Sequence, residues 1–259
     1  MTNDQGILLV GHGTRDARGQ AEFREAAMML RERMSEILVV DCFLELATPD
    51  IAAGVDALVQ TGVQEIVAAP LLLFSAGHAK RDIPAAIEAA VRRHDGLSWK
   101  MAAPLGEHPA VLKLAAKRFH EAPNLQRLAA SPESEEATTL VFVSRGSSDA
   151  EAIAAVHQFF DAHRSALNNV TAARVCFLAA AKPKLEETLH WAMNQSPSRI
   201  VVQPHLLFHG QLMEEIREAV AALRSTSATS GKEWRIADYL GPSPEIIDAL
   251  VSRIGEAME

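Results

Sequence analysis

Two histidines and one glutamate of this 259-residue chain follow apolar segments in a way that suggests chemistry. His12 directly follows ILLVG, Glu45 comes two residues after ILVVDCF, and His78 comes shortly after IVAAPLLL. If these segments are neighbouring parallel strands, the three side chains share one edge of the sheet, where ligands of such sheets bind. Two imidazoles and a carboxylate can hold a borderline divalent cation and leave positions open for a second ligand. The same groups can instead accept protons.

Each of these residues also has a purely structural interpretation. A single histidine near a strand end is commonly a hydrogen-bonded structural residue, and Glu45 can cap the helix that follows it. Glycines beside the histidines favour function, because a residue without a Cβ lets the backbone approach a ligand closely. Gly13 follows His12, and Gly77 precedes His78. We therefore predict that Gly13 and Gly77 lie against a substrate.

Three cations lie close to this set in the sequence. Arg15 follows His12 by three residues, and Lys80 and Arg81 follow His78. Taken singly, they are surface charges exposed to water. Beside a site they suit a polyanionic substrate, because Lys and Arg form charge-assisted hydrogen bonds with anionic oxygens. We predict that all three bind substrate.

The first half alternates short apolar runs with longer segments of helical periodicity. The runs are apolar on both faces, as in buried parallel strands, and predict strands at 7–11, 37–43, 66–73 and 99–104. Helices are predicted near 20–34, from Thr48-Pro49 with Thr48 as N-cap, over about 82–93, and from near Pro109. Such alternation predicts a four-stranded parallel sheet with right-handed crossovers and helices on both faces.

The second half repeats this plan. VGHGTRD aligns with VSRGSSD, CFLELATPDI with CFLAAAKPKL, IVAAPLLLFSAG with IVVQPHLLFHG, and LGEHP with LGPSP. The order is the same and the offset stays between 133 and 135 residues, which indicates an internal duplication. Further strands are predicted near 139–144, 172–178, 199–204 and 234–239.

The predicted fold is therefore α/β, with two Rossmann-like domains related by duplication. A Ser/Pro/Glu stretch at 129–138 lacks apolar periodicity and is predicted to link them. The expected domains are 1–130, which carries the candidate active-site residues, and 131–259, a degenerate copy that contributes to a substrate cleft.

The second copy lacks the chemical set of the first. Its corresponding positions carry Arg145, Ala179 and Leu212, and three residues that disappear together behave like one site. We predict that Arg145 binds substrate. His205 and His209 are new to this copy, but their spacing falls on a strand and its exit, so no shared metal site is expected. His209 is predicted to face the substrate.

Composition and charge narrow the classes of function. Hydrophobic residues make up 48% and charged residues 22% of the chain, a soluble globular balance. The formal net charge of −8 argues against nonspecific binding to nucleic acid or to an anionic membrane. A signal peptide and a long apolar run are both missing, so we expect a cytoplasmic protein. The two cysteines, Cys42 and Cys176, are too few for a disulfide framework.

Several familiar motifs are absent from the sequence. The chain contains no GxxxxGK[ST] phosphate loop, no GxGxxG opening the first helix, and no GxSxG nucleophile elbow. The main rival is a histidine phosphatase, whose first-strand motif Arg-His-Gly-x-Ser/Thr is similar to the segment GHGT at residues 11–14. Gly11 stands here where that family has its phosphate-binding arginine, and the duplication has no place in that family.

Taken together, the segments resemble the class II chelatases of the sirohydrochlorin type, the CbiX/SirB group, in their long form with two fused half-domains. The matching pieces are VGHGTRD, FLELATPDI with Glu45, PLLLFSAGHAKRDIP with His78, and the degenerate PHLLFHGQL of the second copy. The resemblance covers almost the entire chain.

This resemblance implies that the protein inserts Co²⁺ or Fe²⁺ into sirohydrochlorin for sirohaem or cobalamin synthesis, without ATP or an organic cofactor. It implies that His12 and His78 are metal ligands or bases, and that Glu45 is a third ligand or a proton acceptor. The cations Arg15, Lys80, Arg81 and Arg145 would hold the eight carboxylates of the macrocycle. A monomer is expected to form the cleft from its two halves. A tetrapyrrole or metal carrier is the non-enzymatic alternative.

Overall fold

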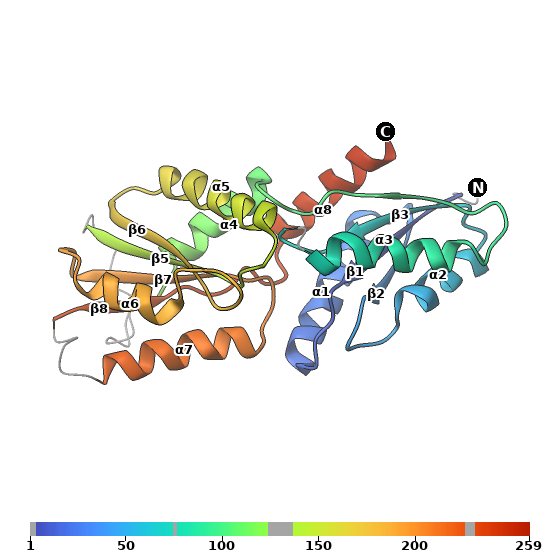
Figure 1. Ribbon diagram of the computed structural model, residues 1–259. Helices are drawn as coiled ribbons and strands as arrows, with labels where there is room; N and C mark the ends of the chain where they lie inside the picture. The colour runs from blue at the N-terminus through green and yellow to red at the C-terminus, as the bar shows by residue number, and fades with distance from the viewer. Residues whose placement is uncertain (1–3, 75–76, 124–136, 226–230) are drawn as a thin grey trace. The chain divides into compact units, whose positions relative to one another are not determined.

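The computed structural model describes residues 4–74, 77–123, 137–225 and 231–259, and at 77–79 it describes the backbone alone. Strands and helices alternate along these ranges (Figure 1). The first repeat contains β1 (Gln5–Gly11), α1 (Ala17–Arg33), β2 (Leu38–Phe43), α2 (Ile51–Gln60), β3 (Glu65–Pro70), α3 (Gly77–Val91), β4 (Ser98–Met101) and α4 (Pro109–His120). The second contains β5 (Thr138–Ser144), α5 (Ala150–Ala166), β6 (Val170–Phe177), α6 (Leu185–Met193), β7 (Arg199–His205), α7 (Gln211–Arg224), β8 (Glu233–Ile236) and α8 (Pro244–Met258).

The strands form two parallel four-stranded sheets, in the orders β2-β1-β3-β4 and β6-β5-β7-β8. This confirms the predicted fold class. The central strands are apolar on both faces because helices cover both: Ile7 to Val10 of β1 and Leu140 to Val143 of β5 are all fully buried.

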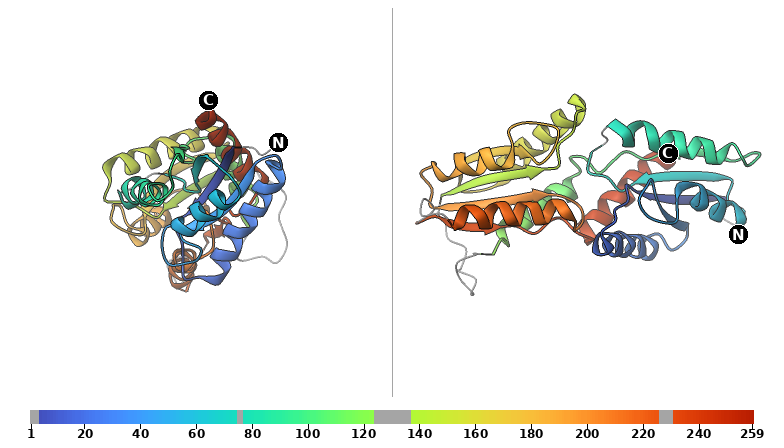
Figure 2. Two further views of the ribbon diagram at one scale, coloured as in Figure 1. Left: turned by 90° about the vertical axis from the view of Figure 1, so that its right-hand side faces the viewer. Right: turned by 60° about the horizontal axis from the view of Figure 1, so that its bottom comes forward.

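The helices of the first sheet lie on two sides. α2 packs beside α3 on one face, and α1 packs beside α8 on the other, as the right-hand view of Figure 2 shows for α1 and α3. The loops after β1 and β3 therefore leave neighbouring strands toward opposite faces. A ligand crevice is expected at this point, beyond the carboxyl ends of the strands.

The backbone repeats the duplication in detail. Leu46 and Ala180 both have positive φ, of 62° and 51°. Isolated bridges join Phe43 to Asp50 and, in the second copy, Phe177 to Lys184. A cis peptide bond precedes the proline of both loops. The alignment of the two halves is thus also an alignment of conformations.

Each compact unit of the structure contains the last helix of the other sequence repeat. One unit comprises Met1–Val111 with Gly241–Glu259, and the other comprises Leu112–Leu240. α8 packs on α1 and β3 of the first unit. In the second unit, the Gln203 side chain of β7 donates a hydrogen bond to the Ala115 carbonyl of α4 (2.8 Å).

These units do not coincide with the expected divisions at 1–130 and 131–259, because each sheet takes the closing helix of the other repeat. The predicted linker at 129–138 lies almost entirely outside the described residues.

The start of α2 differs from its prediction. Thr48 is not the N-cap, because the chain first passes through the bridge from Phe43 to Asp50. The helix begins at Ile51, and the Asp50 carboxylate accepts a hydrogen bond from the Ala53 amide (2.8 Å). A carboxylate satisfies these end amides better than a threonine hydroxyl does, since it also interacts favourably with the helix dipole.

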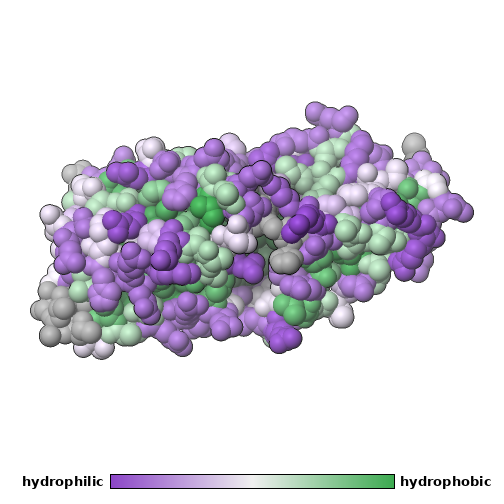
Figure 3. All heavy atoms as spheres, in the orientation of Figure 1, coloured by the Kyte–Doolittle hydropathy of each residue, from purple (hydrophilic) through white to green (hydrophobic). Residues whose placement is uncertain are grey.

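The surface is polar where the core is not. Hydrophilic residues dominate the face drawn in Figure 3, with apolar patches between them. None of the helices in the described ranges is long and apolar enough to cross a membrane.

A buried polar cluster distinguishes the core of the second unit. His163 and Gln203 are buried, and the Nε2 atom of His163 lies 2.9 Å from the Gln203 amide oxygen. The His205 ring lies close to the rings of Phe142 and Phe159 and is tilted relative to both. Burial lowers the pKa of His163, and it lowers the pKa of His205 to about 3. Both imidazoles are therefore neutral in the folded state near neutral pH.

The corresponding positions of the first unit are apolar. Leu30 and Leu71 stand where the second unit has His163 and His205, and both leucines are buried.

We expect this cluster to make the protein acid-sensitive. The folded-state pKa of His205 lies below its ordinary value of 6.5, so the unfolded chain binds more protons as the pH falls from about 6.5 toward 3. The contribution of these neutral histidines to the free energy of unfolding is therefore fully present above about pH 6.5. Below that pH the free energy of unfolding falls, by up to about 1.4 kcal/mol per pH unit for each such histidine. Urea unfolding of the wild type and of His205→Leu, at pH 7.5 and 5.0, measures this. The variant should lose less stability between the two values; an equal loss in both proteins contradicts the assignment.

Candidate functional site

The pairing of β1 with β2 continues beyond the strands and places His12 beside Glu45. After the last strand pair, the Leu44 amide donates to the Gly11 carbonyl (2.9 Å) and the Glu45 amide donates to the His12 carbonyl (3.1 Å). The Nδ1 atom of His12 lies 3.6 Å from Oε1 of Glu45. The two side chains are 30% and 54% exposed, so an ion from solvent can reach both.

This separation suits two ligands of one metal ion. Ligands at about 2.1 Å from a tetrahedral metal are about 3.4 Å apart, close to the 3.6 Å found between His12 and Glu45. The distance is too long for a strong hydrogen bond. A neutral imidazole and an ionised carboxylate both offer lone pairs, so the pair can hold a divalent cation or accept a proton.

A tight turn fixes the position of Glu45. The Ala47 amide donates to the Glu45 carbonyl (2.8 Å), which closes a three-residue turn around Leu46, a residue with φ of 62°. A Cβ atom on Gly13 would lie 1.7 Å from the Glu45 carbonyl oxygen, and the φ of Gly13 is 97°. The contact between the two loops is thus sufficient reason for a glycine at this position. The predicted contact of Gly13 with substrate stays a prediction.

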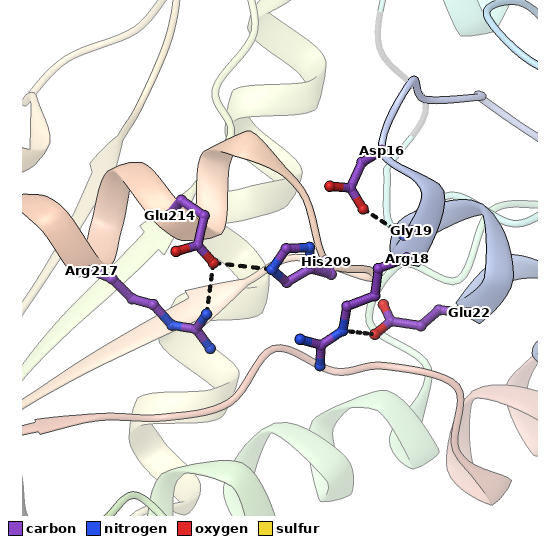
Figure 4. A network of polar contacts seen from close by, with 7 residues as sticks. All are labelled: Asp16, Arg18, Gly19, Glu22, His209, Glu214 and Arg217. Carbon is purple, nitrogen blue, oxygen red and sulfur yellow. Dashed lines mark hydrogen bonds and ion pairs between the residues drawn. The ribbon is translucent and has the colours of Figure 1, made fainter.

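The loop that carries His12 is anchored to α1. The Asp16 carboxylate caps the helix by accepting a hydrogen bond from the Gly19 amide (2.7 Å), as Figure 4 shows. The Gln20 side chain donates to the Thr14 carbonyl (2.8 Å). Arg15 lies between these anchors and is exposed.

The third part of the candidate site follows β3, the strand on the other side of β1 from β2. β3 pairs with β1, and the Leu71 amide donates to the Val10 carbonyl (2.9 Å). Gly77 and His78 are the first two residues of α3. The side chain of His78 lies outside the described atoms, and among the side chains that are described no three His, Cys, Asp or Glu residues form a metal-binding group. The helix exposes Lys80 and Arg81 near its start.

The second unit has a different arrangement at its strand exits. Arg145 follows β5 directly and is exposed. In the loop before α7, Nε2 of His209 lies 3.0 Å from a Glu214 oxygen, which also accepts a hydrogen bond from Arg217 (2.7 Å); both groups point toward the carboxylate in Figure 4. The hydrogen bond with His209 is the main cause of the lowered pKa of Glu214, so this carboxylate is ionised.

Sequence reasoning missed Glu214 and Arg217. Their spacing of three residues on a helix was a visible signal, because such residues are neighbours on the helix surface. His205, by contrast, lies in the buried core of the second unit.

The CbiX family model matches this chain twice, at residues 6–122 and 139–257. The chain belongs to the CbiX family. Each match includes one complete repeat with its last helix, so the family unit is the sequence repeat and differs from the compact unit of the structure.

Relatives in this family cover most of the chain. A sirohydrochlorin cobaltochelatase of Priestia megaterium is 29% identical over 255 residues, 98% of this chain and 80% of the relative. A sirohydrochlorin ferrochelatase of the same organism is 32% identical over 241 residues, 91% of this chain and 84% of the relative. The solved structure of SirB from Bacillus subtilis with Fe³⁺ has a TM-score of 0.84 and 28% identity, covering 98% of this chain and 95% of that chain.

Gly13→Ala should destabilise the protein by well over the roughly 1–2 kcal/mol that a positive φ costs an L-residue, because the Glu45 carbonyl must also move. Gly62→Ala is the matched control: Gly62 has a similar φ of 91°, and nothing lies within 4 Å of its added Cβ. Denaturant unfolding compares the two variants. Equal losses of stability would show that the contact between the loops is not the constraint.

Proposed function

We propose that this protein is a sirohydrochlorin chelatase that inserts Co²⁺ or Fe²⁺ into the macrocycle, with His12, Glu45 and His78 as the residues that handle the metal. The observation that carries the proposal is the His12–Glu45 pair, 3.6 Å apart at the exits of β1 and β2. Family membership supports the reaction, since relatives at 29% and 32% identity are sirohydrochlorin cobaltochelatase and ferrochelatase.

The reaction requires two exchanges. A divalent ion must leave water and enter the ring, and two pyrrole N–H protons must depart to keep the charge balanced. His12 and Glu45 bind the ion while leaving coordination positions open. Once the ion has passed to the ring nitrogens, the same lone pairs can take up the released protons. His78, at the start of the helix α3 that follows β3, supplies a third ligand or base.

Charged side chains are assigned to the substrate. Sirohydrochlorin carries eight carboxylates, which suit guanidinium and ammonium groups. Arg15, Lys80 and Arg81 lie at the strand exits of the first unit, and Arg145 and His209 lie at those of the second. Gly77 would let the start of α3 approach the ring closely. The proposed enzyme works as a monomer without ATP or an organic cofactor.

Two alternative functions would involve different reactions at the same residues. A carrier would bind sirohydrochlorin or the metal without accelerating their combination. A histidine phosphatase would form a phosphorylated His12, but Gly11 stands where that enzyme has its phosphate-binding arginine. The carrier is therefore the stronger alternative.

We expect the purified protein to accelerate the change in visible spectrum when metal-free sirohydrochlorin meets Co²⁺ or Fe²⁺. His12→Ala and His78→Ala should each abolish the acceleration. His94→Ala is a matched control, since His94 is also paired with a carboxylate (2.8 Å from Asp56) but follows the C-terminal end of α3. Macrocycle binding without faster metallation would identify a carrier. Full activity in both site variants would remove the proposed roles.

The His12–Glu45 pair should also bind metal in the absence of macrocycle. We expect Co²⁺ to give a visible absorption band with the wild-type protein, and His12→Ala and Glu45→Ala each to weaken binding at least tenfold. Because both ligands share one ion, the double variant should lose less than the sum of the single losses. Strict additivity, measured by cobalt titration of the four proteins, would show that the two residues do not share an ion.

A further inference from the structure

Equivalent loops of the two repeats carry different charges. The loops after β1 and β2 present His12, Glu45, Thr48 and Asp50, whereas those after β5 and β6 present Arg145, Ala179, Lys182 and Lys184 at the same positions. The structure fixes this equivalence, because the isolated bridge that ends at Asp50 recurs at Lys184. At these four positions the second repeat has two carboxylates fewer and three cations more than the first, while Ser148 stands in place of Arg15, in a chain whose formal net charge is −8.

The two loops of the second unit are held together by their backbones. The Ala179 amide donates to the Arg145 carbonyl (2.8 Å). A Cβ atom on Gly146 would lie 2.1 Å from the Ala179 carbonyl oxygen, as in the first unit. The position that carries a metal-handling imidazole in one repeat therefore carries a guanidinium in the other, at the same point of the same interlocked pair of loops.

Lys184 occupies a position that disfavours a cation. It is the N-cap of α6, and its side chain makes no capping hydrogen bond. Asp50 caps α2 at the equivalent position. Loss of a capping side chain costs about 1 kcal/mol, and a positive charge at a helix N-terminus opposes the helix dipole. Local rules of this kind are broken most often at functional sites.

No carboxylate in the described part of the chain lies within ion-pair distance of Arg145, Lys182 or Lys184. Glu186 and Glu187 follow in the first turn of α6 without pairing to them. The charges of the three cations are therefore available to an external anion.

We propose that Arg145, Lys182 and Lys184 form a carboxylate-binding rim on the second unit, which receives the peripheral carboxylates of the tetrapyrrole. This inference rests on the proposed function and adds Lys182 and Lys184 to the residues that recognise the substrate. In this proposal the first repeat carries the groups that handle the metal together with Arg15, Lys80 and Arg81, and the second repeat has cations at the positions of His12, Thr48 and Asp50 that bind further carboxylates of the macrocycle.

Binding of metal-free sirohydrochlorin to the intact protein, followed by its absorption at several salt concentrations, tests the rim. Lys182→Gln with Lys184→Gln should weaken binding about tenfold at low salt and flatten its salt dependence, since exposed ion pairs are modest and screened. Lys184→Asp restores the residue type of the first repeat. It should weaken binding while raising the melting temperature, a combination that loss of folding cannot produce.

Lys113→Gln with Arg164→Gln is the charge-matched control, because it removes two exposed cations from α4 and from the last turn of α5. Wild-type affinity in both rim variants would overturn the proposal, as would equal weakening in this control. If rim variants bind weakly but the wild type does not accelerate metallation, the rim stands and the chelatase function fails. If metallation is rapid and its KM is unchanged in the rim variants, the function stands and the rim fails.

Discussion

The contact between Gly13 and the carbonyl of Glu45 is the constraint on which the site depends. Two loops that leave adjacent parallel strands would normally diverge, since one leads to a helix on each face of the sheet. Here they stay paired for two further hydrogen bonds, because Gly13 has no Cβ to separate them and the turn around Leu46 directs the Glu45 carbonyl toward it. This backbone contact brings His12 and Glu45 together, so the two side chains need no direct hydrogen bond to stay side by side.

The same backbone arrangement recurs in the second unit with different side chains, so one fold can present two different sets of chemical groups. Gly146 and Ala179 reproduce the interlocked loops in the second unit. The conformation does not depend on the side chains at these positions, so they were free to change during divergence. Arg145 could replace a histidine, and Lys184 could replace a capping aspartate, without altering the path of the chain. The main cost was a less favourable start to α6.

Much of the fold could be predicted from the sequence because parallel strands buried on both faces are continuous apolar runs. The strands and their order of alternation with helices followed from this pattern, and the juxtaposition of His12 and Glu45 was expected from strand topology. The start of α2 could not be predicted from a Thr-Pro pair, because the bridge from Phe43 to Asp50 depends on pairing with a distant part of the loop. The same limit applied to Glu214, whose importance appears only when His209 lies beside it.

The exchange of terminal helices was also beyond sequence reasoning. The amphipathic patterns of α4 and α8 show that each must cover a sheet, but they do not say which one. Local pattern predicts the existence of an element, whereas its partner is decided by packing, as the hydrogen bond from Gln203 to Ala115 illustrates.

That exchange has a consequence for how the two repeats can evolve. The fourth helix of each repeat completes the core of the other unit. A chain divided between the repeats would therefore give two products, each of which lacks a helix that covers its own sheet and carries the helix that covers the other sheet. Side chains in the loops can therefore change independently in the two repeats, whereas both repeats are needed together to complete both cores.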